Sequence, residues 1–185
     1  NVGIYENLGA ELPGNLVFYD HEGNPKQLKD LMSSNKPTLL NFVYYTCPML
    51  CNLLADGIFF GLSELDNKFL ERFNVVTISM DHRDNNDSAT LFRAKYLDKL
   101  NNINKKVDWS FYYADQDQFN ALSDIVGFKY RFIDATQEYS HAAGIYIISP
   151  NKKISRYLYG ISFQPQDLKL SLLEAMEEKS VKTVD

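Results

Sequence analysis

The chain has 185 residues, of which 45% are hydrophobic and 23% charged, and its net charge is −5. This composition is typical of a globular protein and excludes disorder, collagen and a coiled coil as descriptions of the whole chain. Because the chain is acidic and contains no Lys/Arg block, it lacks the clustered cations that phosphate backbones require, so we expect no nucleic-acid partner. At this length we expect a single domain over residues 1–185.

The first part of the chain predicts a lead-in, a hairpin and a buried strand. Residues 1–15 show no strong periodicity and are expected to be extended. Residues 16–20 and 26–28 flank a turn-rich segment, which predicts an N-terminal β-hairpin. Residues 38–45 are almost continuously apolar, as expected for a parallel strand that is covered on both faces.

The remainder of the chain predicts alternating helices and strands. The predicted elements are a helix over 48–70, a strand over 73–80, a helix that Asp87 or Ser88 caps and that runs to about residue 100, a strand over 109–113, a helix over 115–126 stopped by Gly127, strands over 142–149 and 154–159, and a helix from 165 to about 178. This order predicts an α/β fold with a central mixed β-sheet, helices on both of its faces and right-handed crossovers.

Both cysteines of the chain, Cys47 and Cys51, follow the first long strand at positions i and i+4 of the predicted helix. On a helix these positions share one face, and a helix N-terminus favours the thiolate. The carboxyl end of a strand is also where ligands usually bind in open α/β sheets. Two neighbouring thiolates could bind a soft metal or close into a disulfide, and the sequence leaves both possibilities open.

A histidine, His141, directly precedes the predicted strand over 142–149. We expect the entry to this strand to lie beside the helix that carries the cysteines, so that His141 becomes a third metal donor. Two thiolates and an imidazole form a soft donor set that favours Cu(I) and also accommodates Cu(II) and zinc. A closed structural zinc site would require four ligands, which two cysteines and one histidine do not supply.

Asp81 and His82 follow the second long strand, whose carboxyl end faces the same edge of a parallel sheet. Asp81 either orients a histidine as a second-shell acceptor or caps the loop, and the sequence supports both roles equally. For His82 we expect a loop position, with an extra metal donor or a proton-linked switch as the alternative.

Several motifs together resemble the Sco/SenC family, from roughly residue 3 to residue 185. They are Cys-Pro-Met-Leu-Cys at 47–51, Ser-Met-Asp at 79–81, Ser-His at 140–141 before Gly-Ile-Tyr-Ile-Ile-Ser-Pro, and a tail over 156–175 that is similar to the bacterial branch. The resemblance implies a thioredoxin-like fold and one copper ion per chain, bound by Cys47, Cys51 and His141. It also implies a metallochaperone, rather than an enzyme, that helps to build the dinuclear copper centre of cytochrome c oxidase.

The same resemblance implies partners and a compartment. The partners are the copper-centre subunit of cytochrome c oxidase and another copper chaperone or a thioredoxin-like reductant. The compartment is extracytoplasmic, in the periplasm or at the outer face of the cytoplasmic membrane, with an anchor in a segment absent from this chain. Residues 179–185 resemble a point where some relatives continue, so we expect a truncated tail. The family commonly places prolines after its Ser-x-Asp, and residues 82–86 contain none.

A thiol–disulfide oxidoreductase that reduces the cysteines of a copper-site partner is the alternative function. Cys47 would attack and Cys51 would resolve the mixed disulfide. The CxxxC spacing differs from the CxxC of thioredoxin-type enzymes, and residues 126–149 contain no proline, whereas such enzymes have a cis-proline opposite the cysteines. These two features favour copper binding over dithiol exchange.

Overall fold

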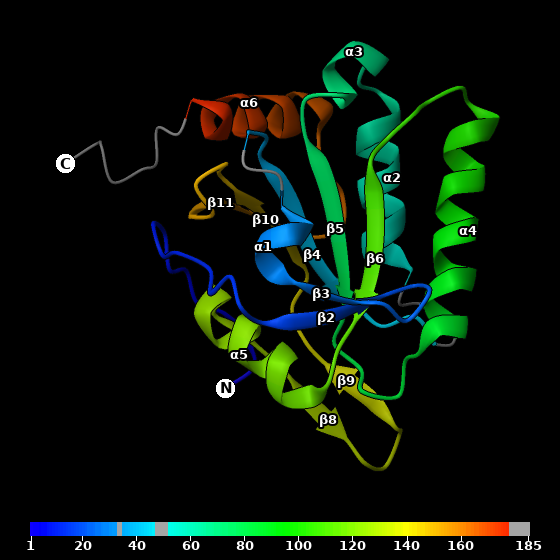
Figure 1. Cartoon of the computed structure of the whole chain (residues 1–185), viewed down its shortest axis with the longest axis vertical. Helices are drawn as coiled ribbons and strands as arrows, with labels where there is room; N and C mark the ends of the chain where they lie inside the picture. The colour runs from blue at the N-terminus through cyan, green and yellow to red at the C-terminus, as the bar shows by residue number, and fades with distance from the viewer. Residues whose placement is uncertain (33–34, 47–51, 178–185) are drawn as a thin grey trace.

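A computed structural model describes residues 1–32, 35–46 and 52–177 of the protein (Figure 1). In these residues a seven-stranded sheet has the order β11-β10-β4-β5-β6-β2-β3. Its strands are β2 (Val17–Asp20), β3 (Pro25–Gln27), β4 (Thr38–Val43), β5 (Asn74–Ser79), β6 (Trp109–Tyr113), β10 (Gly144–Ile148) and β11 (Ile154–Tyr159). β4, β5 and β6 are parallel, and the other pairings are antiparallel, so the predicted mixed sheet and its N-terminal hairpin are confirmed.

The described helices lie on both faces of this sheet (Figure 1). They are α1 (Leu28–Leu31), α2 (Leu53–Ser63), α3 (Asn67–Leu70), α4 (Asn86–Asn102), α5 (Gln116–Val126) and α6 (Pro165–Met176). α2, α4 and α6 pack with one face of the sheet in a first core, and α1 and α5 pack with the other face in a second core. The predicted architecture, with helices on both faces, is confirmed.

The central strand β4 shows why this part of the sequence is so apolar. All six of its residues are buried, with Leu39 and Val43 in the first core and Leu40 and Phe42 in the second. Its one amide, Asn41, accepts a hydrogen bond from the Thr77 hydroxyl at 2.9 Å and donates to a backbone carbonyl of β5 at 3.3 Å. A strand that is covered on both faces satisfies its polar groups inside the sheet.

Two small strand pairs lie outside the main sheet. β1 (Gly3–Ile4) pairs with β7 (Phe128–Lys129), so the lead-in contributes a short strand. β8 (Arg131–Ile133) and β9 (Glu138–Ser140) form an antiparallel hairpin that leads directly into His141 and β10. This hairpin is not predicted by the sequence, because its residues are largely polar and do not form an apolar run.

The predicted helix boundaries need three corrections. The single helix expected over 48–70 is wrong beyond Ser63, because the Asp66 side chain accepts a hydrogen bond from the Phe69 amide at 2.8 Å and starts a separate helix. Its first residues, 48–51, lie outside the described part of the chain. Neither Asp87 nor Ser88 is the N-cap of α4, because Asn85 holds that position and forms a reciprocal capping box with Ser88. α6 ends at Met176, earlier than expected.

Candidate functional site

The candidate site lies at the carboxyl ends of β4 and β5, where the chain continues toward α2. Tyr44 and Tyr45, which follow β4, are buried, and α2 begins at Leu53. Cys47 and Cys51 fall within residues 47–51, outside the described residues, so their arrangement stays a prediction. The structure describes the residues that surround this segment.

His141 lies between β9 and β10 and is partly buried. Because β10 runs antiparallel to β4, its beginning lies beside the end of β4, and the ring centroids of His141 and Tyr44 are 6.4 Å apart. Tyr44 is three residues before Cys47. The structure therefore brings His141 beside Tyr44 at the end of β4, and its placement relative to the two cysteines stays a prediction.

The hydrogen bond of His141 determines which ring nitrogen is available. Its Nδ1 lies 2.8 Å from the carbonyl oxygen of Ala142. A carbonyl oxygen can only accept, so Nδ1 carries a proton, and in the neutral imidazole Nε2 has the free lone pair. Fixing the tautomer through the second nitrogen is the usual arrangement for a histidine that binds a metal. The side chain is thus suited to donate Nε2 to copper.

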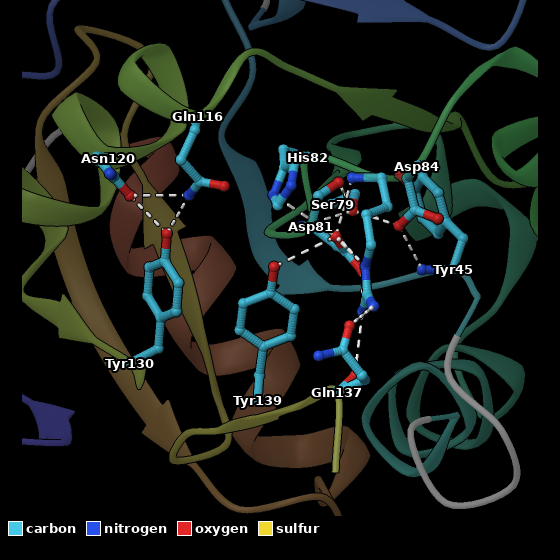
Figure 2. Close-up of polar contacts among 11 residues, drawn as sticks. Tyr45, Ser79, Asp81, His82, Asp84, Gln116, Asn120, Tyr130, Gln137 and Tyr139 are labelled. Carbon is cyan, nitrogen blue, oxygen red and sulfur yellow. Dashed lines mark hydrogen bonds and ion pairs between the residues drawn. The ribbon is translucent and has the colours of Figure 1, made fainter. Parts of the chain in front are cut away.

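Asp81 lies two residues after the end of β5, and its side chain is fully buried. The carboxylate accepts hydrogen bonds from Arg83 Nε at 2.9 and 3.0 Å, pairs with Arg83 NH2 at 2.8 Å, and accepts from the Tyr139 hydroxyl at 3.2 Å. Burial by itself raises the pKa of Asp81, but the hydrogen bonds and the charge of Arg83 lower it below its usual value. Figure 2 shows Tyr139 pointing toward this carboxylate, two residues before His141.

His82 is the more exposed neighbour of Asp81. Its side chain is 59% exposed, and its Nδ1 lies 3.9 Å from Asp81 Oδ1. The structure gives His82 the loop position that we expect, while its behaviour toward a metal stays a prediction.

A second carboxylate, Asp84, ties β4 and β5 together at the same edge. Its Oδ2 accepts hydrogen bonds from the Tyr45 amide at 2.7 Å and from the Ser79 hydroxyl (Figure 2). Burial raises the pKa of Asp84, and the hydrogen bonds from Ser79 and Tyr45 offset this only in part. Asp84 thus holds the backbone two residues before Cys47.

An open hollow of about 610 Å³ lies beside this edge. Its lining consists of Tyr44, Thr46, Arg83, Thr136, Gln137 and Glu138. Thr46 immediately precedes Cys47, so the hollow gives a partner access to the region where the cysteine segment begins.

Searches for metal clusters and membrane spans cover only part of the chain. Within residues 1–32, 35–46 and 52–177, no three His, Cys, Asp or Glu side chains gather closely enough to hold a metal. Cys47 and Cys51 lie outside these ranges. Among the described helices, none combines the length and the apolar character that crossing a bilayer requires.

Sequence reasoning missed three residues of this edge: Arg83, Asp84 and Tyr139. Each acts through a contact with a distant or buried partner, and a polar loop such as 82–86 shows no periodicity that would reveal such contacts. One signal was available: the proteins that the sequence resembles commonly have prolines in this loop, residues 82–86 contain none, and a loop without them requires other restraints.

Fold and site together define a thioredoxin-like α/β protein with an imidazole beside the end of its central strand. No family model and no curated protein matches the sequence. Solved structures that share the fold over nearly the full length include Sco proteins and candidate electron transfer proteins, which confirms the fold implied by the sequence resemblance.

Three of these structures illustrate the match. A candidate electron transfer protein from Aquifex aeolicus VF5 has a TM-score of 0.76 at 24% identity, covering 91% of this chain and 94% of its own. BsSco, a member of the Sco family of cytochrome c oxidase assembly proteins in which a disulfide switch was identified, has a TM-score of 0.69 at 15% identity, covering 94% and 98%. Copper-bound ScoI from Arabidopsis thaliana has a TM-score of 0.67 at 16% identity, covering 93% and 99%.

Proposed function

We propose that this protein is a Sco-type metallochaperone that binds one copper ion through Cys47, Cys51 and His141. It delivers the copper to the dinuclear centre of cytochrome c oxidase, or helps to assemble that centre. The observation that carries the proposal is the placement of His141, whose Nε2 is available beside the strand end that leads to Cys47. The shared fold with copper-bound ScoI and with BsSco supports it.

The chemistry of the three donors suits a cargo that must be released. Thiolates are soft ligands that favour Cu(I), and the imidazole retains the metal when it is Cu(II). Three donors leave the coordination incomplete, so a ligand of the acceptor can bind before a donor of this protein departs. The hollow bounded by Thr46 and Arg83 gives that ligand a path to the site.

The test is a copper titration of the reduced protein against a competing chelator. We expect one copper per chain, and we expect His141→Ala to weaken binding at least tenfold, or about 1.4 kcal/mol. His82→Ala is the matched control, because it removes an exposed imidazole from the same edge and should leave the affinity unchanged. Unchanged affinity in His141→Ala would overturn the three-donor site.

The second candidate is a thiol–disulfide oxidoreductase that reduces a copper-site partner. It is favoured by the likeness to BsSco, a protein with a disulfide switch. Exchange requires an attacking and a resolving thiol but no imidazole ligand. Cytochrome oxidase activity in cells that carry His141→Ala separates the two: copper delivery requires that the activity falls, whereas dithiol exchange leaves it largely intact. Cys51→Ser should abolish both.

The proposal also includes the partners and the compartment. The copper-centre subunit of cytochrome c oxidase is the acceptor, and another copper chaperone or a thioredoxin-like reductant prepares the site. We place the protein outside the cytoplasm and expect it to be membrane-anchored. Fractionation of cells that express the complete protein, with oxidase subunits as markers, tests this placement.

A further inference from the structure

The β8–β9 hairpin leads the chain directly to His141. It lies outside the seven-stranded sheet, and none of the residues of its two strands is buried. His141 directly follows the last residue of β9. The position of His141 relative to β4 therefore depends on what holds the hairpin.

The base of the hairpin is held by α5. Tyr130, which directly precedes β8, donates its hydroxyl proton to Asn120 Oδ1 at 2.5 Å and accepts from the Gln116 amide (Figure 2). This contact fixes the entry to β8. It does not fix the turn between the strands or the path of β9 toward His141.

The turn and β9 are held by the loop after β5. Arg83 NH2 lies 3.2 Å from the backbone carbonyl of Gln137, and Arg83 NH1 lies 3.4 Å from the Gln137 side-chain oxygen. The guanidinium carbon of Arg83 also lies 5.1 Å from the ring centroid of Phe132 in β8. One side chain thus contacts both the β8 strand and the residue that precedes β9.

Asp81 completes this contact from the main sheet. Its buried carboxylate contacts two nitrogens of the Arg83 guanidinium. It also accepts a hydrogen bond from Tyr139 within β9. A planar guanidinium that is already oriented by a carboxylate loses little further freedom when it binds a carbonyl. The carboxylate and guanidinium form one rigid unit that joins the end of β5 to the hairpin.

We propose that Arg83 is a positioning residue for the copper site: its guanidinium, oriented by Asp81, fixes β9 and thereby holds His141 Nε2 against the end of β4. The inference rests on the proposed function of His141 as a copper donor. Arg83 does not touch the metal in this arrangement. It acts through Gln137, Tyr139 and the short connection to His141.

The test uses Arg83→Gln and a matched control on the same hairpin. Arg131→Gln removes the same charge from an exposed residue of β8 that forms no ion pair with any residue in the described part of the chain. We expect Arg83→Gln to weaken copper binding about tenfold, or 1.4 kcal/mol, and Arg131→Gln to leave it within twofold. Without copper, hydrogen exchange of the hairpin amides should accelerate in Arg83→Gln only.

A double-mutant cycle separates positioning from a general loss of structure. If Arg83 acts through His141, then adding Arg83→Gln to His141→Ala should weaken copper binding no further. Full additivity would overturn the proposal, because Arg83 would then act independently of His141. Tyr139→Phe serves as a second variant, since it retains the ring beside Tyr44 at 5.0 Å but loses the bond to Asp81, and it should produce a smaller loss of the same kind.

The two proposals fail in distinguishable ways. If His141→Ala itself leaves copper affinity unchanged, the proposed function fails. If His141→Ala weakens binding but Arg83→Gln neither weakens it nor accelerates exchange in the hairpin, only the positioning role is overturned.

Discussion

The centre of the sheet and the β8–β9 hairpin both contribute to the candidate site, but they are built differently. Every residue of β4 and β5 is buried, and rings from both faces surround this part of the sheet. The hairpin strands contain no buried residue and are held by side-chain contacts of Tyr130, Tyr139 and Arg83. The cysteine segment thus follows a fully buried strand, whereas His141 follows a hairpin of partly exposed strands that is held by polar and ring contacts.

In the proposed copper carrier, this difference separates two requirements. The strand that leads to the cysteines is held in place by packing, which is costly to disturb. The hairpin that precedes the histidine is held partly by hydrogen bonds, which individually contribute about 1 kcal/mol, or more where a charge is involved. In the proposed copper site, a histidine at the end of such a hairpin is easier to move than the packed end of β4. Four changes test the comparison, from the largest expected effect to the smallest.

Phe42→Ala should have the largest effect. Phe42 is 2% exposed, and its ring centroid lies 4.9 Å from that of Phe119 and 5.3 Å from those of Phe128 and Tyr146. Removing it leaves a cavity between the sheet and α5, and we expect the free energy of unfolding to fall by about 3–5 kcal/mol. Denaturant titration measures this. Phe132→Ala in the hairpin should cost only about 1 kcal/mol, and equal costs would contradict the comparison.

Asp81→Asn should cost about 2 kcal/mol at neutral pH, because it replaces a charge-assisted contact with Arg83 by a weaker one. The pKa of Asp81 is lowered in the folded protein, so its contribution is complete above the unfolded pKa of about 4 and disappears as the pH falls through the folded pKa. Besides Arg83, His82 and Tyr139 face the carboxylate. The measurement is the free energy of unfolding of the wild-type protein and of Asp81→Asn at several pH values between roughly 3 and 7. A difference that does not shrink in acid would refute it.

Asp84→Asn should show the opposite pH dependence and a smaller effect, about 1 kcal/mol or less. Burial raises the pKa of Asp84 in the folded protein, and Asp81 adds to this. The contribution of the wild-type carboxyl is therefore present below the unfolded pKa and is lost as the pH rises through the folded pKa. Asparagine retains an oxygen that can accept from Tyr45 and Ser79. It does not ionise, so the variant does not lose this stability as the pH rises. The same pH series measures how the difference in unfolding free energy from the wild type changes with pH. A change of the same sign for Asp81→Asn and Asp84→Asn would rule out the opposite pH dependence.

Lys129→Gln should have the smallest effect. Lys129 pairs with Asp124 at 3.0 Å, but the two side chains are 43% and 66% exposed. Solvent screens such a pair, so we expect a change below about 0.5 kcal/mol. Thermal unfolding at low and high salt is the measurement. A loss of stability as large as that of Asp81→Asn would show that exposed and buried ion pairs contribute equally to the stability of this protein.

The sequence predicts most of the fold because packing leaves a periodic signal. The structure confirms the strands over 109–113 and 154–159, which apolar alternation defines locally. It also confirms the end of α5 at Gly127, which a glycine with a φ of 86° defines. The sequence predicts one helix over 48–70, because its apolar spacing continues past Ser63. Spacing does not show that the Asp66 side chain starts a new helix.

The candidate site was predictable only in part, for a related reason. The placement of His141 follows from topology, because the start of β10 must lie beside the end of β4. The roles of Arg83, Asp84 and Tyr139 depend on contacts between residues far apart in the chain, such as the 58 positions that separate Tyr139 from Asp81. A single sequence contains no local pattern for such contacts.

The extended lead-in has a consequence for self-association. Residues 9–12 form backbone hydrogen bonds with residues 152–154, at 2.8 Å from Gly9 to Ile154 and 2.9 Å from Ile154 to Ala10. They therefore cover the start of β11, an outer strand of the main sheet, while the opposite outer strand, β3, has three residues and begins with Pro25. Uncovered outer strands recruit other chains into aggregates. The lead-in therefore leaves less of this outer strand free to pair with a strand of another chain.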